Sequence, residues 1–117
     1  MFQIATADLE LEHSREESLL QGSEKQFGIY QITERDPEHN YRFMGLDYVE
    51  KKGMTVSRAD YDLIYAAPLT DKDTLDGIYE RFNIQRPADF TGHSLSVSDV
   101  VVLNDGSTVK AYYVDSV

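Results

Sequence analysis

The residues of this chain that could carry out a reaction gather in the stretch 85–99. It holds His93, Ser94 and two carboxylates, Asp89 and Asp99. A nucleophilic site needs a base within hydrogen-bond reach of the serine and a third group that orients the base. Closeness in sequence does not supply that geometry, and no Gly-x-Ser-x-Gly turn is present. A small hydrolase-type enzyme that uses His93 with a nearby carboxylate is therefore an alternative hypothesis, and we predict no catalytic residue.

We predict neither a metal site nor a cofactor site. The three histidines of the chain show none of the i, i+4 spacing by which a helix presents two metal ligands. Asp71, Asp73 and Asp76 lie close together, but no calcium-binding loop surrounds them, and acids in this position are typical of a helix start. The sequence also lacks a phosphate-binding loop and a Gly-x-Gly-x-x-Gly motif.

The same stretch has the composition of a binding loop. Loops held between a helix and a strand often carry binding residues, and an aromatic beside an arginine is a common anchor at interfaces. We predict that the binding residues are Arg86, Asp89, Phe90 and His93. The alternative is structural. In that case Phe90 turns inward to fill the core, and the polar side chains satisfy backbone groups of the loop.

A helix before this stretch and a hairpin after it must hold it in place. Apolar residues at i, i+3, i+4 and i+7 predict a helix over 73–83 with Asp73 as its N-cap, Asn83 at its end and Phe82 in the core. The apolar run 100–103 predicts a strand that is covered on both faces. Asp105-Gly106 predicts a two-residue turn, which would place Val102 opposite Val109 on a face packed against the helix.

The remaining segments complete a small fold. We predict strands at 27–32 and 61–67, a short extended piece at 41–44, a helix at 45–52 and a return strand at 108–114. Alternation would place Tyr61, Leu63, Tyr65 and Ala67 on one face. The predicted fold is α+β, with a small, largely antiparallel sheet and two short helices in the order β-α-β-α-β-β. Residues 1–26 are predicted to be an N-terminal appendage or linker with one short helix near 14–21, and residues 27–117 the domain.

Composition limits the classes of partner. The chain has 117 residues, which is enough for one domain, and it has no cysteine, which excludes disulfides and thiol chemistry. A net charge of −10 disfavours nucleic acid and anionic membranes as partners, and basic residues such as Arg58 are expected at the surface or beside a neighbouring acid. An acidic decoy that binds a DNA-recognising protein is a further alternative. Because no signal peptide or membrane-spanning run is visible, we expect a cytoplasmic location.

Several runs in the second half of the chain carry a family resemblance. They are ADYDLIYAAPL, DTLDGIYERFNIQRPADFTGHSLSVSDVVVL and KAYYVDS, and RFMGLDYVEKKG precedes them. Over about residues 27–117 the chain resembles the YodL-like domain of Firmicutes. The resemblance implies a module of a larger protein carried on conjugative or other mobile elements, and it transfers no catalytic residue because the family has no established activity. The leading interpretation is a non-enzymatic protein-interaction module with an unknown protein partner.

Overall fold

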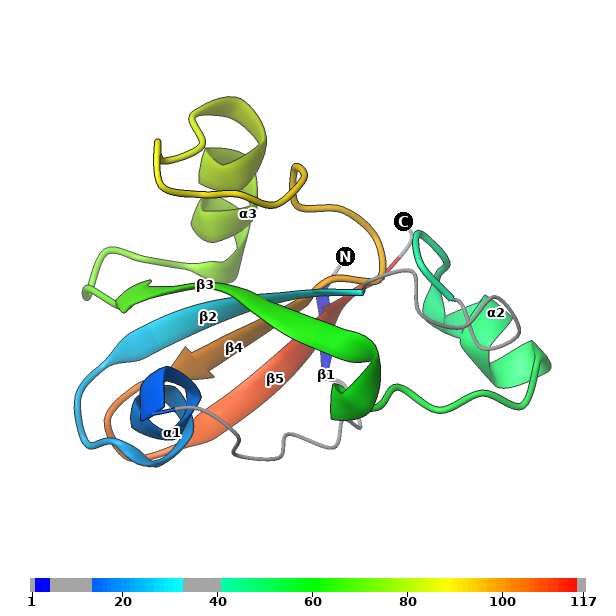
Figure 1. The fold of residues 1–117 in the computed structure, drawn as a ribbon, viewed down its shortest axis with the longest axis horizontal. Helices are drawn as coiled ribbons and strands as arrows, with labels where there is room; N and C mark the ends of the chain where they lie inside the picture. Colours follow the sequence, from blue (N-terminus) through cyan, green and yellow to red (C-terminus); the bar gives the residue numbers. More distant parts are fainter. Residues whose placement is uncertain (1, 5–13, 33–40, 116–117) are drawn as a thin grey trace.

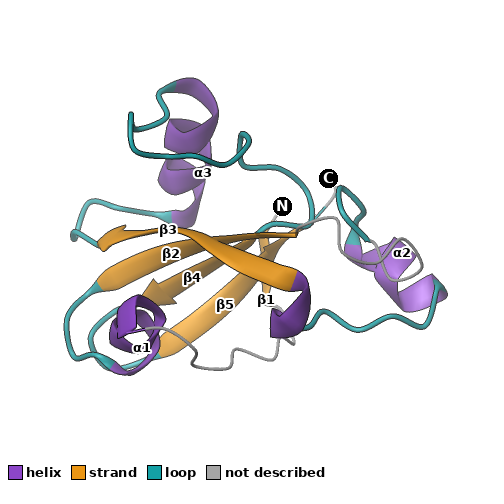
Figure 2. Ribbon diagram, viewed as in Figure 1, coloured by secondary structure: helices purple, strands orange, loops and turns teal. Residues whose placement is uncertain are grey.

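The computed structural model describes residues 2–4, 14–32 and 41–115. Its elements, in chain order, are β1 (Phe2–Ile4), α1 (Ser14–Gln21), β2 (Gln26–Ile32), α2 (Leu46–Lys51), the 3-10 helix η2 (Arg58–Asp60), β3 (Tyr61–Pro68), α3 (Leu75–Ile84), β4 (Val100–Asn104) and β5 (Val109–Val114). The strands form one antiparallel sheet in the order β1-β5-β4-β2-β3 (Figures 1 and 2). From β2 onward the order is β-α-β-α-β-β, so the predicted α+β fold is confirmed.

The sheet has a separate apolar layer on each face. One layer, the α1 face, has at its centre Leu19, Tyr30, Ile32, Val100, Val102 and Tyr113. The other, the α3 face, has at its centre Phe27, Ile29, Ile78, Phe82, Val101 and Val114. Because successive residues of a strand point to opposite faces, β2 and β4 contribute to both layers. The prediction that the run 100–103 is covered on both faces is therefore confirmed.

The hairpin between β4 and β5 differs from its prediction in register. Val102 lies opposite Ala111 and Asn104 opposite Val109, so the loop is longer than two residues. The Asp105 carboxylate accounts for the longer loop, because it accepts the N–H groups of Ser107 and Thr108 at 2.9 and 2.8 Å. Val102 and Val109 still share a face, since a shift by an even number of residues preserves the alternation. That face packs against α1, however, and α3 covers the opposite one.

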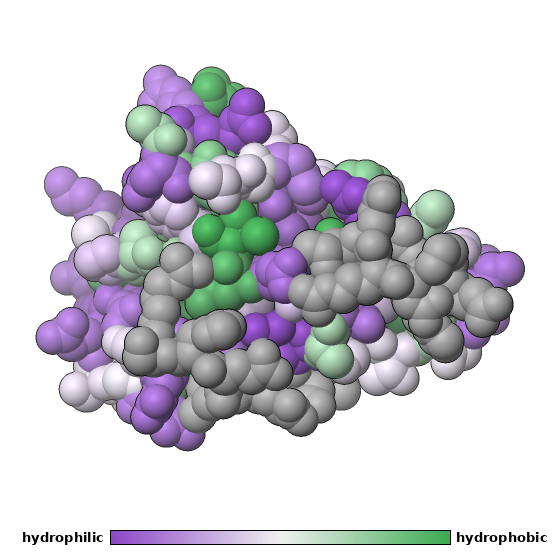
Figure 3. Space-filling view, in the orientation of Figure 1, coloured by the Kyte–Doolittle hydropathy of each residue, from purple (hydrophilic) through white to green (hydrophobic). Residues whose placement is uncertain are grey.

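A β-bulge in β3 overturns the prediction that its alternate residues share one face. Ile29 lies opposite Tyr65 while Tyr30 lies opposite Leu63, which leaves Ile64 as the extra residue. The extra residue reverses the alternation, so that Leu63 packs on the α1 face and Tyr65 on the α3 face. β3 is an edge strand whose residues are mostly half-buried, and apolar side chains gather over it in Figure 3.

Helix α3 begins one residue later than expected, and it includes Asn83, so the prediction that Asn83 ends the helix is wrong. Thr74 is the N-cap, and its hydroxyl accepts the Gly77 N–H at 3.0 Å, so the prediction of Asp73 as the cap is wrong. Asp73 instead accepts the Thr70 N–H at 2.8 Å, in the preceding turn. At the other end the helix includes Ile84, which is 72% exposed.

Outside the central hairpin, the two short helices lie where they were predicted, but one predicted extended segment does not form. Helices occupy Ser14–Gln21 and Leu46–Lys51, where short helices were predicted. The piece at 41–44 is a turn with a positive φ of 68° at Phe43, so the prediction of an extended segment is wrong. β1 pairs with β5, and α1 packs on the α1 face. The division of the chain at residues 26 and 27 stays a prediction.

Substitution of Phe82 tests the packing of the α3 face. Phe82 is fully buried, and its ring lies 4.9 Å from that of Phe90 and 5.1 Å from that of Tyr65. We expect Phe82→Ala to lower the free energy of unfolding by about 3–5 kcal/mol, through lost burial and a cavity. Urea denaturation measures this loss, with the exposed Ile84→Ala as the matched control, for which we expect a change within about 0.5 kcal/mol. Equal losses for the two variants would contradict the packing described.

Candidate functional site

Two connections meet at one end of the sheet. The first is the turn at residues 41–45, which precedes α2. The second is the connection from α3 to β4, drawn in yellow and orange in Figure 1, which passes over the end of the sheet between α3 and α2. Their contacts with each other and with the last residues of β2 form a polar cluster beside an exposed apolar turn. We describe this arrangement as the candidate site.

Gln31 of β2 holds the second connection to the sheet. Its side-chain amide donates to the His93 carbonyl at 2.8 Å and to Asp99 Oδ2 at 3.2 Å. The same carboxylate oxygen accepts the Ser96 N–H at 2.9 Å, which closes a turn in the connection. Gln31 and Asp99 are both buried. One buried amide therefore fixes the position of both His93 and Asp99.

The imidazole of His93 faces the protein with both nitrogens. Nδ1 lies 2.7 Å from the Ser94 carbonyl, so we assign the hydrogen to Nδ1. Nε2 is buried and lies 3.8 Å from Asp99 Oδ1, and neither of these two atoms has a hydrogen-bond partner within the described part of the chain. A general base must reach the proton that it abstracts, and here both ring nitrogens face groups of the protein itself.

Burial changes the protonation of Asp99. Loss of solvent raises the pKa of Asp99 to about 8, although the Ser96 N–H, the Gln31 amide and the Arg42 charge act in the opposite direction. At neutral pH the carboxyl is therefore largely protonated. A neutral carboxyl can donate a hydrogen bond, and Asp99 Oδ1 lies 3.8 Å from His93 Nε2, which is an acceptor when the hydrogen is on Nδ1.

Two strained residues meet beside this pair. Phe43 and Ser98 both have a positive φ, of 68° and 86°, which is unusual for residues other than glycine and costs of order 1–3 kcal/mol each. The Phe43 N–H donates to Ser98 Oγ at 2.8 Å, and the Ser98 N–H donates to the Val114 carbonyl at 2.9 Å. The turn at Phe43 is thus fastened to the residue that precedes Asp99.

The strained turn presents apolar side chains to solvent. Phe43 is 52% exposed and Met44 41% exposed. The Phe43 ring stands edge-on to the His93 ring with 5.4 Å between centroids, and the Tyr113 hydroxyl donates to the Met44 carbonyl at 2.6 Å. We call Phe43 and Met44 the apolar tip. Its backbone is held by side chains of the fold while its own side chains remain largely accessible.

The four residues predicted to bind lie in different surroundings. Arg86 and Asp89 are both exposed, in the second connection. Phe90 packs in the α3 face, where its ring lies 5.9 Å from that of Tyr65, as the structural alternative proposed. His93 belongs to the polar cluster. Binding by these four residues remains a prediction.

Sequence reasoning missed three members of the site, namely Gln31, Phe43 and Ser98. Gln31 had a visible signal, because it is the one polar residue within the predicted strand 27–32 apart from its tyrosine. Phe43 and Met44 also gave a signal, because this apolar pair comes shortly after the polar segment 33–40. Ser98 had no signal, since only its backbone conformation and its contact with Phe43 make it part of the site.

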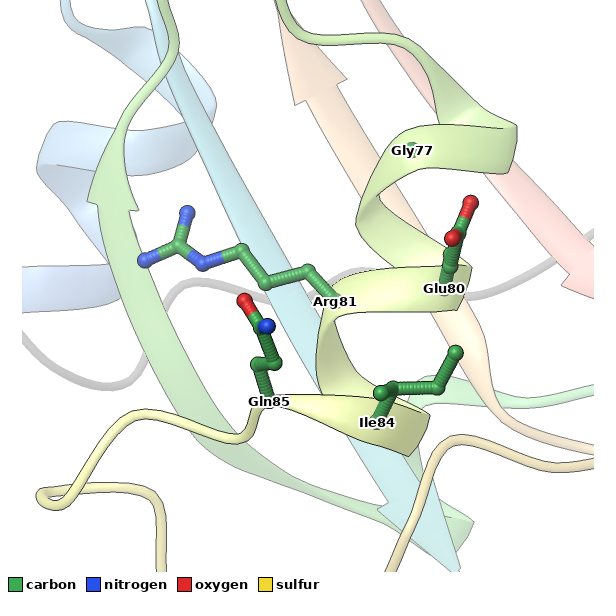
Figure 4. Close-up of a pocket in the computed structure, with 5 residues that line it drawn as sticks. All are labelled: Gly77, Glu80, Arg81, Ile84 and Gln85. Carbon is green, nitrogen blue, oxygen red and sulfur yellow. The ribbon is translucent and has the colours of Figure 1, made fainter.

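The outer surface of α3 carries a separate shallow depression of about 320 Å³, lined by Gly77, Glu80, Arg81, Ile84 and Gln85. Figure 4 shows Arg81 and Gln85 directed to one side of the helix, and Glu80 and Ile84 to the other. No member of the polar cluster lines it. Within residues 2–4, 14–32 and 41–115, no group of three or more histidines and acids could hold a metal ion. In the same ranges no helix has the length and apolar character needed to cross a bilayer.

The fold and the site define a small antiparallel α+β domain with a buried polar cluster beneath an exposed apolar turn. The chain belongs to the YodL-like domain family, whose model matches residues 26–117. No curated protein and no solved structure gives a significant match to the chain. The family therefore establishes what kind of domain this is and leaves its activity to be inferred from the site.

The pH dependence of stability tests the protonation of Asp99. Its pKa is raised to about 8 in the folded state, against about 3.9 in the unfolded chain. The stabilisation from this proton is complete below about pH 4 and is lost as the pH rises through about 8. Asp99→Asn resembles the protonated acid and has no proton to lose. We therefore expect the free energy of unfolding of the parent to fall by a few kcal/mol between about pH 5 and 9, relative to that of Asp99→Asn.

Urea denaturation at several pH values measures this difference. The exposed Glu80→Gln is a matched control, since it removes one carboxylate from the surface of α3. The charged or titratable side chains that face Asp99 among the described residues include His93 and Arg42, and both are unchanged in the two variants. Parallel pH profiles for the parent and Asp99→Asn would contradict a neutral Asp99.

Proposed function

We propose that this domain is a non-enzymatic protein-interaction module that binds a partner protein through the apolar tip. The observation that carries the proposal is the exposure of Phe43 and Met44 on a turn whose backbone is fastened at both residues. Among the described residues, the large apolar side chains with high exposure are Phe43, Met44 and Ile84. Two of these three adjoin each other at the candidate site.

The physical cost of the tip supports a binding role. A positive φ at Phe43 is unfavourable, and exposing its ring forgoes the stabilisation that burial would provide. A turn fixed in advance loses little entropy when a partner binds, and aromatic, Met and Arg side chains are enriched at interfaces. The Arg42 guanidinium lies 4.7 Å from the centroid of the Phe43 ring, so an arginine adjoins the aromatic and methionine side chains of the tip.

The geometry of His93 favours binding over hydrolysis. The fold does place a carboxylate near His93, as the hydrolase hypothesis requires. The Ser94 carbonyl occupies Nδ1, however, and Nε2 faces the buried Asp99, so a bound nucleophile would find no base. The decoy hypothesis has less support at this site, because its accessible side chains are apolar and Arg42 is positive. We further propose that the module is part of a larger mobile-element protein, on the strength of the family resemblance.

Substitution of the tip tests this function. Asn tolerates a positive φ, so Phe43→Asn removes the aromatic ring while the turn is kept. We expect Phe43→Asn and Met44→Ser each to reduce partner capture from native host lysate by about tenfold or more, with a thermal midpoint close to that of the parent. Ile84→Ser is the matched control, since it removes an exposed apolar side chain from α3. Unchanged capture by Phe43→Asn, or an equal loss with Ile84→Ser, would contradict the proposal.

A further inference from the structure

The α1 face carries a set of buried polar side chains that contact α1. Arg58 of η2, Tyr30 of β2 and Asn104 of β4 are buried, and each donates a hydrogen bond to α1 or to the residue that follows it. Buried polar groups of this kind are stable only with partners in good geometry. These three side chains therefore define where a helix must lie and which groups it must present.

The first of these groups is a carboxylate near the start of the helix. Arg58 donates from Nε to Glu16 Oε2 at 2.7 Å and from Nη2 to Oε1 at 3.2 Å, which is a bidentate pairing. The Tyr30 hydroxyl donates to the same Oε2 at 2.6 Å. Glu16 is fully buried, and the Arg58 guanidinium lies 5.2 Å from the centroid of the Tyr30 ring. The planar Arg58 guanidinium and the Tyr30 hydroxyl together are suited to bind one carboxylate.

The second group is the end of the helix. Asn104 Nδ2 donates to the Leu19 carbonyl at 2.8 Å and to the Gly22 carbonyl at 2.9 Å. The last carbonyls of a helix have no partner within the helix, so one amide of β4 acts as an external cap. Gln26 adds a bond from its amide to Ser18 Oγ at 2.9 Å. The surface thus fixes the length and direction of the bound helix.

The third group is an apolar side chain three residues after the carboxylate. Leu19 is fully buried and lies over Gly28 of β2. A Cβ at Gly28 would come within 2.4 Å of Leu19 Cδ2, so the absence of a side chain at Gly28 makes the space for Leu19. Arg58, Tyr30, Asn104 and Gly28 together form what we call the helix groove.

The groove and its occupant belong to different parts of the chain. The family match begins at residue 26, so it includes the whole helix groove and excludes α1. α1 has eight residues, and isolated helices of that length are marginal in water, so the groove supplies most of its stability. A short connection at residues 22–25 joins the two, and Figure 1 shows α1 against the sheet at the end of this connection.

We infer that the helix groove is a binding site for an amphipathic helix with a carboxylate in its first turn and a leucine three residues later. In this chain α1 is its tethered occupant, and a partner helix of the same pattern displaces α1. The tether gives α1 an effective concentration at the groove of the order of millimolar. A partner helix at a lower concentration must therefore bind the groove more tightly than untethered α1 does. This second site does not depend on the apolar tip.

Cutting the tether in the folded, full-length chain tests the inference. A protease site is inserted between Glu24 and Lys25, the purified protein is cut, and a labelled peptide of residues 1–24 is added. The peptide also carries β1, which pairs with β5, so the groove is tested by the differences between peptides that all share β1. We expect fluorescence anisotropy to show the labelled peptide exchanging with the cut fragment. A peptide with Glu16→Gln should bind at least tenfold more weakly, because it leaves the Arg58 charge without a carboxylate.

Matched variants separate recognition from general loss of structure. A peptide with Glu17→Gln should bind like the parent peptide, since Glu17 is exposed. Arg58→Lys in the protein should reduce the discrimination between the parent peptide and the Glu16→Gln peptide, because lysine cannot pair in a bidentate manner. Phe43→Asn should leave peptide binding unchanged, so failure at one site does not imply failure at the other. Loss of the fold on cutting, absence of exchange, or equal effects of Glu16→Gln and Glu17→Gln would each overturn the inference.

Discussion

Both faces of the sheet have to be covered, because its central strands β2 and β4 are buried on both sides. The described helices are short, with eight, six and ten residues in α1, α2 and α3. Connections must therefore supply part of the cover. Leu95 does so on the α3 face, and Tyr41 and Val56 do so on the α1 face. A connection that enters a core brings its backbone polar groups with it, and these need partners. Gln31 of β2 and Asn104 of β4 provide such partners, for the carbonyls of His93 and Gly22.

The bulge in β3 is a consequence of the same requirement. With strict alternation, β3 would place Tyr61, Leu63 and Tyr65 together in one layer, and no aromatic side chain of β3 would reach the other layer. The extra residue Ile64 instead directs Tyr61 and Leu63 to one layer and Tyr65 and Ala67 to the other. Bulges also disturb the pattern of free backbone groups at an edge, which discourages pairing with another chain.

Local periodicity was sufficient to predict the elements but not their exact pairing. The i, i+3, i+4, i+7 spacing placed Ile78 and Phe82 correctly in a core, because the helical period alone decides which residues share a face. The hairpin register failed because the Asp105 side chain competes with the backbone for the turn, and the cap of α3 was misplaced because Asp73 and Thr74 are both suitable acceptors. The bulge leaves no mark in the composition of β3, since Ile64 is a normal strand residue.

The sites were harder to predict, since their contacts join residues far apart in the chain. Glu16 and Arg58 are 42 positions apart and Gln31 and Asp99 are 68 apart, so the sequence around each residue does not identify its partner. The two clusters also differ in how completely they are satisfied. Arg58 and Glu16 pair in a bidentate manner, which fixes one helix in one place. His93 Nε2 and Asp99 Oδ1 lie 3.8 Å apart without a described hydrogen bond, beside the strained contact between Phe43 and Ser98. A fully paired cluster is suited to recognition of one geometry, whereas in the second cluster the Gln31 amide fixes the chain and leaves one histidine nitrogen and one carboxyl oxygen unsatisfied beside the apolar tip.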